Sequence, residues 1–279
     1  MAIKNPPINQ LSFFLGGHDL EMLTISELLH TEGIDTRHIH DHGLSWGAGV
    51  DDYRDGIEAS LAAGGLPVLI ELAEAEVYED RAVIIDHHNK AAGKNAPTSL
   101  HQLFNLLQLP AFRWTRRFEL VAANDRGYIP ALLEVGASRH EIAEIRAADR
   151  KAQGISSEEE ESCRQAANEL EKMAGGKLTI AHLPHNRTSP LCDRLEQALG
   201  GPGYQNLLVL CPTEISFFGD GKIVLGLAES FPGSWYGGSL PDRGYWGYAL
   251  SGQSSEQILA FICSQLTNIS SDLLPNARC

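Results

Sequence analysis

Apolar runs and helical stripes alternate through the first half of the chain. Short apolar runs at residues 11–15, 67–72 and 83–85 have the length of buried strands, and residues 37–44 allow another strand. In the segment 22–29, apolar residues recur every three or four positions, which is typical of a helix that packs on a sheet. This βα alternation predicts an α/β fold with a doubly wound, mostly parallel sheet.

The pattern changes after residue 150. Residues 151–176 are rich in acids and predict an exposed connecting helix that ends at a pair of glycines. Residues 177–279 predict a second, smaller α+β domain, and residues 1–150 form the first domain. The strands and helices expected in the second domain are strands at 178–183, 207–210, 214–218 and 223–227, and helices at 190–199 and 255–266.

Composition narrows the classes of partner. With 279 residues, 43% of them hydrophobic, the chain is long enough for two modest domains. A net charge of −14 argues against binding long nucleic acid but leaves a nucleotide or a short oligonucleotide open. The five cysteines have no CxxC spacing, and no signal peptide or membrane-length apolar run is recognisable, so we expect a cytoplasmic protein without membrane contact. The oligomeric state stays open, with a homodimer among the alternatives.

A carboxylate and two imidazoles follow one of the predicted strands directly. Asp86, His87 and His88 come immediately after the run 83–85. Parallel α/β sheets build their sites at the carboxyl ends of the strands, so these side chains are candidates for a functional site. Carboxylate and imidazole together suit Mn, Fe or Zn better than Mg or Ca.

Further acids are expected near the same edge of the sheet. Asp19 and Glu21 follow the first strand at its turn into a helix, Glu71 follows another apolar run, and Asp125 ends an apolar helical stripe. Acids in a first helical turn are also favoured by the helix dipole alone. Acids and imidazoles from several strand ends nevertheless fit a hydrolase in which two metal ions share a carboxylate and activate a water. No GxSxG nucleophile motif is present.

The segment Ile84-Ile85-Asp86-His87-His88-Asn89, followed later by Asn124-Asp125, resembles the DHH phosphoesterase superfamily. This superfamily includes RecJ-type exonucleases, nanoRNA phosphodiesterases and manganese-dependent inorganic pyrophosphatases. The resemblance covers the N-terminal half of the chain. It implies a phosphoesterase that binds one or two divalent ions, Mn²⁺ first among them. A metal-activated water would hydrolyse a small phosphorylated substrate such as a nucleotide or a short oligonucleotide.

The resemblance also implies roles for individual residues. The implied metal ligands are Asp19, Glu21, Glu71, His87 and Asp125. Two residues, His88 and Arg126, would stabilise charge on the phosphoryl oxygens during catalysis. Two others, Asp86 and His18, would support the ligands through hydrogen bonds.

The second predicted domain is similar in size and pattern to the DHHA1 substrate domain of this superfamily. That domain carries a Gly-Gly-Gly-His loop; here Gly237 and Gly238 are present and the histidine is missing. Arg243 would bind phosphate, while Trp235 or Tyr245 would stack on a base or simply pack. The remaining substrate-binding candidates are Asn89, beside the histidines, and Arg187, ahead of a predicted helix N-terminus.

Departures from the family pattern keep two other hypotheses open. Leu15 stands where pyrophosphatases and nanoRNases have a histidine, and Glu21 and Glu71 replace aspartates. The chain is then alternatively a degenerate DHH-fold binding or regulatory protein with weak or no catalysis. A third hypothesis is a different metallohydrolase centred on residues 38–42, because His-Ile-His-Asp-His nearly matches the metallo-β-lactamase pattern.

Overall fold

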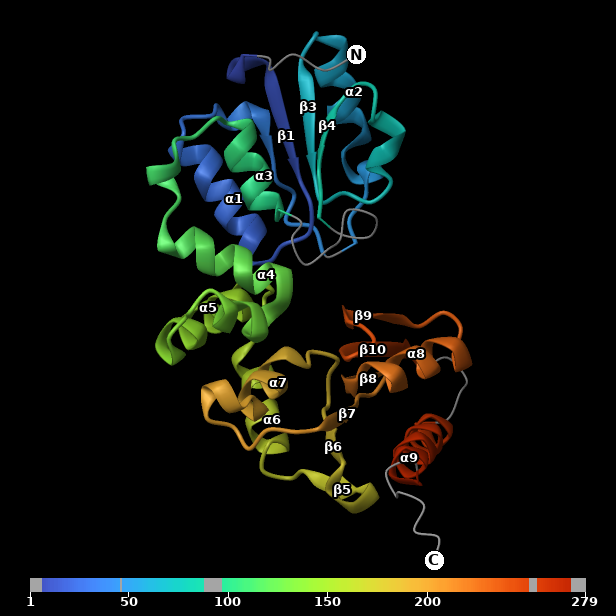
Figure 1. The fold of residues 1–279 in the computed structure, drawn as a ribbon. Coiled ribbons are helices and arrows are strands. Elements are labelled where there is room, and N and C mark those ends of the chain that lie inside the picture. The colour runs from blue at the N-terminus through green and yellow to red at the C-terminus, as the bar shows by residue number, and fades with distance from the viewer. Residues whose placement is uncertain (1–6, 46, 88–96, 251–254, 272–279) are drawn as a thin grey trace, which may run out of the picture. The chain divides into compact units, whose positions relative to one another are not determined.

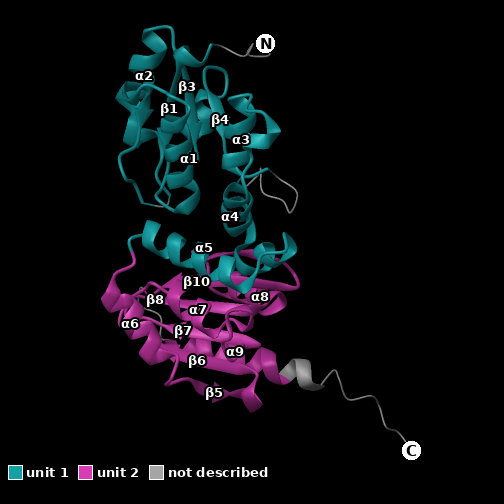
Figure 2. Cartoon of the chain, turned by 90° about the vertical axis from the view of Figure 1, so that its left-hand side faces the viewer, with its two compact units in different colours: residues 1–154 teal, residues 155–279 magenta. Residues whose placement is uncertain are grey.

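The computed structural model describes residues 7–45, 47–87, 97–250 and 255–271. The chain divides into two compact units, residues 1–154 and residues 155–279 (Figure 2). Each unit contains one sheet with helices packed against it. Within the described residues, no helix is both long enough and apolar enough to cross a bilayer.

The first unit is built on a parallel sheet, which confirms the predicted α/β fold class. Its strands stand in the order β2-β1-β3-β4, and every neighbouring pair is parallel (Figure 1). All five residues of β1 are buried, as expected for a strand covered on both faces. The strand bounds are β1 Leu11–Leu15, β2 Ile39–His40, β3 Leu66–Ile70 and β4 Val83–Ile85.

Helices lie on both sides of this sheet. Helices α1 and α3 lie on one side and α2 on the other (Figure 1), and α1 also packs against α4 and α5. The helix bounds are α1 Leu20–Thr31, α2 Arg54–Ala62, α3 Ser99–Leu106, α4 Arg116–Glu134 and α5 Arg139–Ala152. Short 3-10 turns in this unit are η1 Ile8–Gln10, η2 Thr36–His38, η3 Val50–Tyr53, η4 Ala75–Tyr78 and η6 Ala111–Arg113.

The strand register brings three chain segments out at one edge of the sheet. Leu15 at the end of β1 pairs with Ile70 at the end of β3, and Ile70 pairs with Ile85 at the end of β4. The polypeptide therefore leaves all three strands at the same level. For this reason, the acids and the imidazole that follow these strands in sequence are attached to neighbouring points of the backbone.

The second unit contains a six-stranded, mostly antiparallel sheet. Its order is β5-β6-β7-β8-β10-β9, with one parallel pair, β6 and β7. One face packs on α8 and α9 around Phe217 and Trp246, and the other packs on α6 and α7 around Leu207 and Val209. The strand bounds are β5 Glu171–Met173, β6 Leu178–His182, β7 Asn206–Leu210, β8 Glu214–Asp220, β9 Trp235–Ser239 and β10 Arg243–Ala249. The helix bounds are α6 Ser157–Ala166, α7 Ser189–Leu195, α8 Gly221–Ser230 and α9 Ser255–Ser271, with 3-10 turns at η7 Ala174–Gly176 and η8 Gln197–Leu199.

The strand predicted at residues 223–227 is wrong, because these residues lie inside helix α8. Asp220 caps the helix by accepting a hydrogen bond from the backbone N–H of Lys222 at 2.8 Å. Ile223, Val224 and Leu227 are buried at helical spacing. A short apolar run with β-branched residues fits a strand and a buried helix equally well, and the cap decides for the helix.

The connecting helix predicted at residues 151–176 also differs from the structure. Helix α5 extends to Ala152 and ends at Gly154, whose φ of +72° is left-handed. Ser156 then caps the separate helix α6, and β5 follows before residue 176. The acid-rich segment therefore contains one helix and one strand of the second unit rather than a single linker.

The first prediction concerns Gly16, at the turn after β1. A Cβ on Gly16 would overlap the carbonyl oxygen of Glu71 and approach that of Ile70 to 2.9 Å. We expect Gly16→Ala to lower the free energy of unfolding by roughly 1–3 kcal/mol, as overpacking does in tight interiors. In the control Gly49→Ala, the new Cβ has its nearest atom at 3.5 Å. Chemical denaturation of both variants checks this, and equal stability would contradict the close approach at Gly16.

Candidate metal centre

Four side chains converge at the edge where β1, β3 and β4 end. Glu21 lies in the first turn of α1, Glu71 follows β3, His87 follows β4, and Asp125 lies on α4. One ligand atom from each of the four lies within 4.8 Å of all the others. These four residues are called the acid–imidazole cluster below.

The imidazole of His87 makes the short contacts of the cluster. Its Nε2 lies 2.6 Å from Asp125 Oδ2, 3.4 Å from Glu71 Oε1 and 3.8 Å from Glu21 Oε2. The side chains range from 0% exposed for Glu21 to 11% for Asp125. Carboxylates at this burial are costly unless a cation or hydrogen bonds compensate them.

Local backbone contacts position Glu21 and Glu71. Glu21 Oε1 accepts a hydrogen bond from the backbone N–H of Leu100, in the first turn of α3, at 3.1 Å. Glu71 has a left-handed φ of +52°, and its N–H donates to the carbonyl of Ile85 at 2.9 Å. A left-handed glutamate is strained by about 1–3 kcal/mol, and such residues are concentrated at functional sites.

Burial and like charge raise the pKa values of the acids. Burial, and then the charges of Asp125 and Glu71, raise the pKa of Glu21 well above its usual value. Burial and the charge of Glu71 do the same for Asp125. Burial by itself lowers the pKa of His87, but its hydrogen bond with Glu71 and the charge of Glu21 outweigh burial and raise it. With all three carboxylates ionised, the cluster holds more negative charge than a single imidazolium can balance.

The donor set fits a divalent cation. Three carboxylates and one imidazole suit Mn, Fe or Zn better than Mg or Ca. Glu21 Oε2 and Asp125 Oδ2 are buried, and no described group donates a well-formed hydrogen bond to either atom. A cation at the cluster would compensate both oxygens and the repulsion between the acids.

The fifth predicted ligand, Asp19, stands apart from these four. Its Oδ1 accepts a hydrogen bond from the backbone N–H of Met22 at 2.8 Å, so Asp19 is the N-cap of α1. Burial, followed by the charge of Glu71, raises its pKa to about 6. Asp19 therefore lies close enough to interact electrostatically with Glu71, while its Oδ1 caps helix α1. Leu15, where a histidine was expected from the family pattern, is fully buried in β1.

Of the residues predicted to support the ligands or to act in catalysis, the structure describes His18, Asp86 and Arg126. His18 Nε2 lies 3.0 Å from Asp41 Oδ1 and so pairs with a loop carboxylate. The backbone carbonyl of Asp86 accepts a hydrogen bond from Gln102 at 2.9 Å. Arg126 is half-buried on α4 beside His101, whose pKa is lowered by burial and by the charge of Arg126. Two further candidates, His88 and Asn89, lie outside the described residues.

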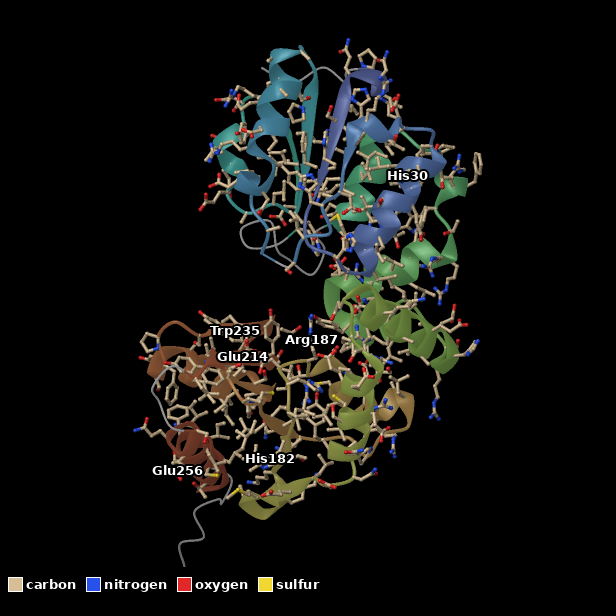
Figure 3. The ribbon with its side chains drawn as sticks, turned by 180° about the vertical axis from the view of Figure 1, so that it is seen from behind. His30, His182, Arg187, Glu214, Trp235 and Glu256 are labelled. Atoms are coloured by element: carbon tan, nitrogen blue, oxygen red, sulfur yellow. The ribbon has the colours of Figure 1, made fainter. Side chains whose placement is uncertain are left out.

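The remaining substrate-binding candidates belong to the second unit. Arg187 is exposed ahead of α7, and Trp235 lies at the start of β9 (Figure 3). Gly237 and Gly238 lie in β9. Arg243, in β10, donates to the carbonyl of Gln205 at 3.2 Å, with its guanidinium 5.3 Å from the centroid of the Tyr204 ring.

The histidines of residues 38–42 do not form a metal group. His38 Nδ1 lies 3.2 Å from Ser12 Oγ. The His40 ring stacks on Phe14 with ring centroids 4.4 Å apart, and the His42 ring lies at the same distance from Tyr53. Among the described residues, the acid–imidazole cluster is the group whose ligand atoms lie close enough to share an ion. The structure gives the hypothesis of a metallohydrolase centred on 38–42 no ligand set.

A buried polar network next to Asp125 was not predicted from the sequence. Its members Asn124, Arg146 and Asp149 are each only 2–3% exposed. The signal was present in α5, where Arg146 and Asp149 fall on the same helical stripe as the buried Ile142 and Ile145. Charged residues at core positions of a helix indicate a buried polar network rather than a solvent-exposed face.

The fold and the cluster together define a two-unit α/β protein with a buried, acid-rich centre suited to a divalent ion. No protein-family model and no curated protein matches the sequence. The structure is similar to a solved structure described as the DHH domain of a member of a family of ribosomal proteins. That likeness has 14% identity and a TM-score of 0.53, and it covers 93% of this chain and 87% of the other.

A second solved structure is similar over the same extent. It is an exopolyphosphatase-related protein from Bacteroides fragilis, with 12% identity, a TM-score of 0.52, and coverage of 94% of this chain and 93% of the other. The fold of this chain is therefore that of solved DHH-domain proteins. The resemblance read from residues 84–89 is confirmed at the level of the fold.

The second prediction concerns stability without metal. The raised pKa values of Asp19 (about 6), Glu21 and Asp125 mean that the folded state holds protons that unfolded carboxyl groups lose near pH 4. This stabilisation is complete below about pH 4 and is lost as pH rises through the folded pKa values. The raised pKa of His87 acts in the same direction.

In chelator, we therefore expect the Tm to fall as pH rises from about 4 through 6 and beyond. Added Mn²⁺ should raise the Tm more at high pH than at low pH, because the ion replaces the protons. Glu21→Gln, which removes one buried charge, should flatten the pH dependence in chelator. Thermal unfolding followed by circular dichroism measures all three effects. A wild-type Tm with the same pH slope as Glu21→Gln would contradict this account.

Proposed function

We propose that this protein is a metal-dependent phosphoesterase that hydrolyses a small phosphorylated substrate, a nucleotide or a short oligonucleotide. The acid–imidazole cluster carries the proposal: four ligand atoms within 4.8 Å of one another at the carboxyl edge of a parallel sheet. The fold, shared with an exopolyphosphatase-related protein, supports the same class of reaction. The proposed ion is Mn²⁺, one per chain, because the described residues bring together one group of ligand atoms and Leu15 offers no ligand.

Each residue of the centre has a defined task in this proposal. Glu21, Glu71, His87 and Asp125 would hold the ion. When bound, the ion supplies Lewis acidity and lowers the pKa of water toward neutrality. Arg126, one position after Asp125 on α4, would neutralise charge on the phosphoryl oxygens. The near absence of solvent at the cluster strengthens each of these electrostatic interactions.

The net charge of −14 supports a short substrate over a long one. A protein that binds long nucleic acid needs many phosphate contacts from Lys and Arg. The candidate cations for phosphate are Arg126 in the first unit and Arg187 and Arg243 in the second. A few cations suffice for one or two phosphates.

Two aromatic rings in the second unit support a substrate that carries a base. Trp235 of β9 lies opposite Gly247 of β10, and Tyr245 of β10 lies opposite Gly237 of β9. A Cβ at Gly247 would overlap the Trp235 ring, and a Cβ at Gly237 would lie 2.7 Å from Tyr245 Oη. Each ring therefore lies over a glycine.

Residues directly opposite in an antiparallel pair project from the same face of the sheet. Trp235 and Tyr245 thus share one face of the β9–β10 hairpin, and each is 41% exposed. We call these two rings the aromatic platform. Exposed aromatic faces of this kind stack on nucleobases without strong sequence preference.

The third prediction tests the reaction. His87→Ala and Asp125→Asn should each lower Mn²⁺-dependent hydrolysis of a dinucleotide by more than about 100-fold, because losing a ligand exceeds the roughly 10–100-fold effect of losing an outer hydrogen bond. His38→Ala, which changes a histidine outside the cluster, is the matched control and should keep wild-type activity. Elemental analysis should give one Mn²⁺ per wild-type chain.

One result would favour the alternative of a binding or regulatory protein. A wild-type protein that binds Mn²⁺ and turns over neither dinucleotides, nucleoside monophosphates nor polyphosphate would overturn the phosphoesterase proposal. Loss of activity in His38→Ala as large as in His87→Ala would direct attention back to residues 38–42.

The fourth prediction tests the aromatic platform. Trp235→Ala and Tyr245→Ala should each raise the KM for a dinucleotide by about tenfold, since stacking is worth roughly 1–3 kcal/mol per base. The KM for an abasic analogue of the same dinucleotide should not change. Tyr236→Ala is the matched control: Tyr236 is 50% exposed and pairs with Trp246, so it projects from the opposite face. An equal effect of Tyr236→Ala, or an equal effect on the abasic analogue, would exclude base stacking.

A further inference from the structure

A buried polar network joins three helices of the first unit next to the acid–imidazole cluster. Arg146 Nη1, on α5, donates to Asn124 Oδ1 on α4 at 2.9 Å and to Asp149 Oδ2 at 2.8 Å. Asp149 Oδ1 accepts from the backbone N–H of Leu20, the first residue of α1, at 3.4 Å. Arg146 is therefore linked to both helices, α1 and α4, that supply cluster carboxylates.

On α4, Arg146 contacts both sides of a break in the helix. The break follows Asp125 closely: Gly127 and Tyr128 have non-helical backbone angles, and φ of Tyr128 is +51°. Asn124, before the break, accepts a hydrogen bond from Arg146. After the break, the Tyr128 ring lies with its centroid 5.0 Å from the guanidinium. Arg146 thus contacts the helix on both sides of the break, next to the turn that carries Asp125.

On α1, the link runs through Asp149. Leu20, whose N–H donates to this carboxylate, lies between the cap Asp19 and the cluster residue Glu21. Gln153 also donates to Asp149 Oδ2 at 3.1 Å, so the carboxylate is held from two directions. The Asp149 carboxylate thus contacts the backbone of the first turn of α1.

The charge of Arg146 is as unusual as its contacts. Among the lysines and arginines that the structure describes, Arg146 alone is buried. A buried ion pair gains little net stability over an apolar pair of the same volume, because desolvation offsets the attraction. Its contribution to the protein is better sought in the orientation of the carboxylates that it reaches.

We propose that Arg146 is a positioning residue of the metal centre. Through Asn124 and Asp149 it holds the Asp125 carboxylate and the first turn of α1 in the arrangement that binds the ion. It sets the affinity for the divalent ion without being a ligand. The inference rests on the metal centre of the proposed function and does not require that the protein turn over a phosphoester.

The experiment measures Mn²⁺ affinity rather than activity. Free Mn²⁺ is titrated against each folded protein and quantified by its electron paramagnetic resonance signal. Arg146→Met leaves Asp149 as a buried charge, so Arg146→Met/Asp149→Asn, which removes both charges, is measured with it. Both should raise the Kd by about 10–100-fold, the range found for outer hydrogen-bond partners of metal ligands. Arg146→Lys, which retains the charge but lacks the planar guanidinium, should give an intermediate Kd.

Lys151→Met is the matched control, because it removes an exposed cation from the same helix. Its Kd should equal that of the wild type. A double variant that is folded by circular dichroism, has a lowered Tm and keeps the wild-type Kd would show a merely structural role and overturn the proposal.

The outcome is separable from that of the proposed function. If the wild type binds Mn²⁺ without hydrolysing any phosphoester while its Kd depends on Arg146, the positioning role stands and the phosphoesterase proposal fails. If the wild type is an active phosphoesterase whose Kd is indifferent to Arg146, only the positioning role fails. A wild type that binds no Mn²⁺ overturns both.

Discussion

The repulsion among three buried carboxylates is the constraint on which the rest of the first unit depends. Glu21, Glu71 and Asp125 come from three different elements and are held with His87 in a space too small for uncompensated charge. Apolar packing of β1 and its neighbours must supply the free energy that keeps them together in the absence of a cation. A cation that binds this arrangement would stabilise the folded state, so that folding and cation binding would be thermodynamically linked.

Much of this arrangement could be predicted from the sequence, because it follows from strand ends. One apolar run ends at Glu71 and another ends shortly before His87. If the two runs are parallel neighbouring strands, as they are here, the chain leaves both strands at the same edge of the sheet, and the two side chains lie close together. That Asp19 caps α1 could not be predicted this way, since an acid at a helix N-terminus looks the same in sequence whether it is a cap or a ligand. Arg146 was missed although the sequence places it on the same helical stripe as Ile142 and Ile145. Its partners on α1 and α4 could not be predicted, because they depend on how α5 packs against those helices. The strand wrongly predicted at residues 223–227 has a different cause: β-branched residues such as Ile223 favour a strand in sequence, but here they lie in a helix capped by Asp220.

In the proposed function, the metal centre belongs to the first unit and base recognition to the second, and each task suits the unit that would carry it. The cluster needs burial, rigid strand ends and compensated charge, which the fully covered parallel sheet provides. The aromatic platform needs exposed ring faces, which the edge strand β9 provides because its neighbour β10 has glycines opposite the rings. A buried strand end would not expose ring faces to a base, and an exposed edge strand would not bury a metal centre. Effects on metal affinity and on base preference should accordingly separate by unit.

The substitution of glutamates for family aspartates, which motivated the hypothesis of a degenerate protein, has a structural explanation. The longer arm of Glu21 spans from α1 to the backbone of Leu100 at the start of α3, so one oxygen is anchored while the other faces the cluster. Glu71 reaches the cluster from a left-handed backbone that turns the chain sharply at the end of β3. A decayed site would be expected to lose such anchors and relax such strain. The presence of both features, together with the nearly complete burial of the four side chains, supports the proposed metal centre over a degenerate site.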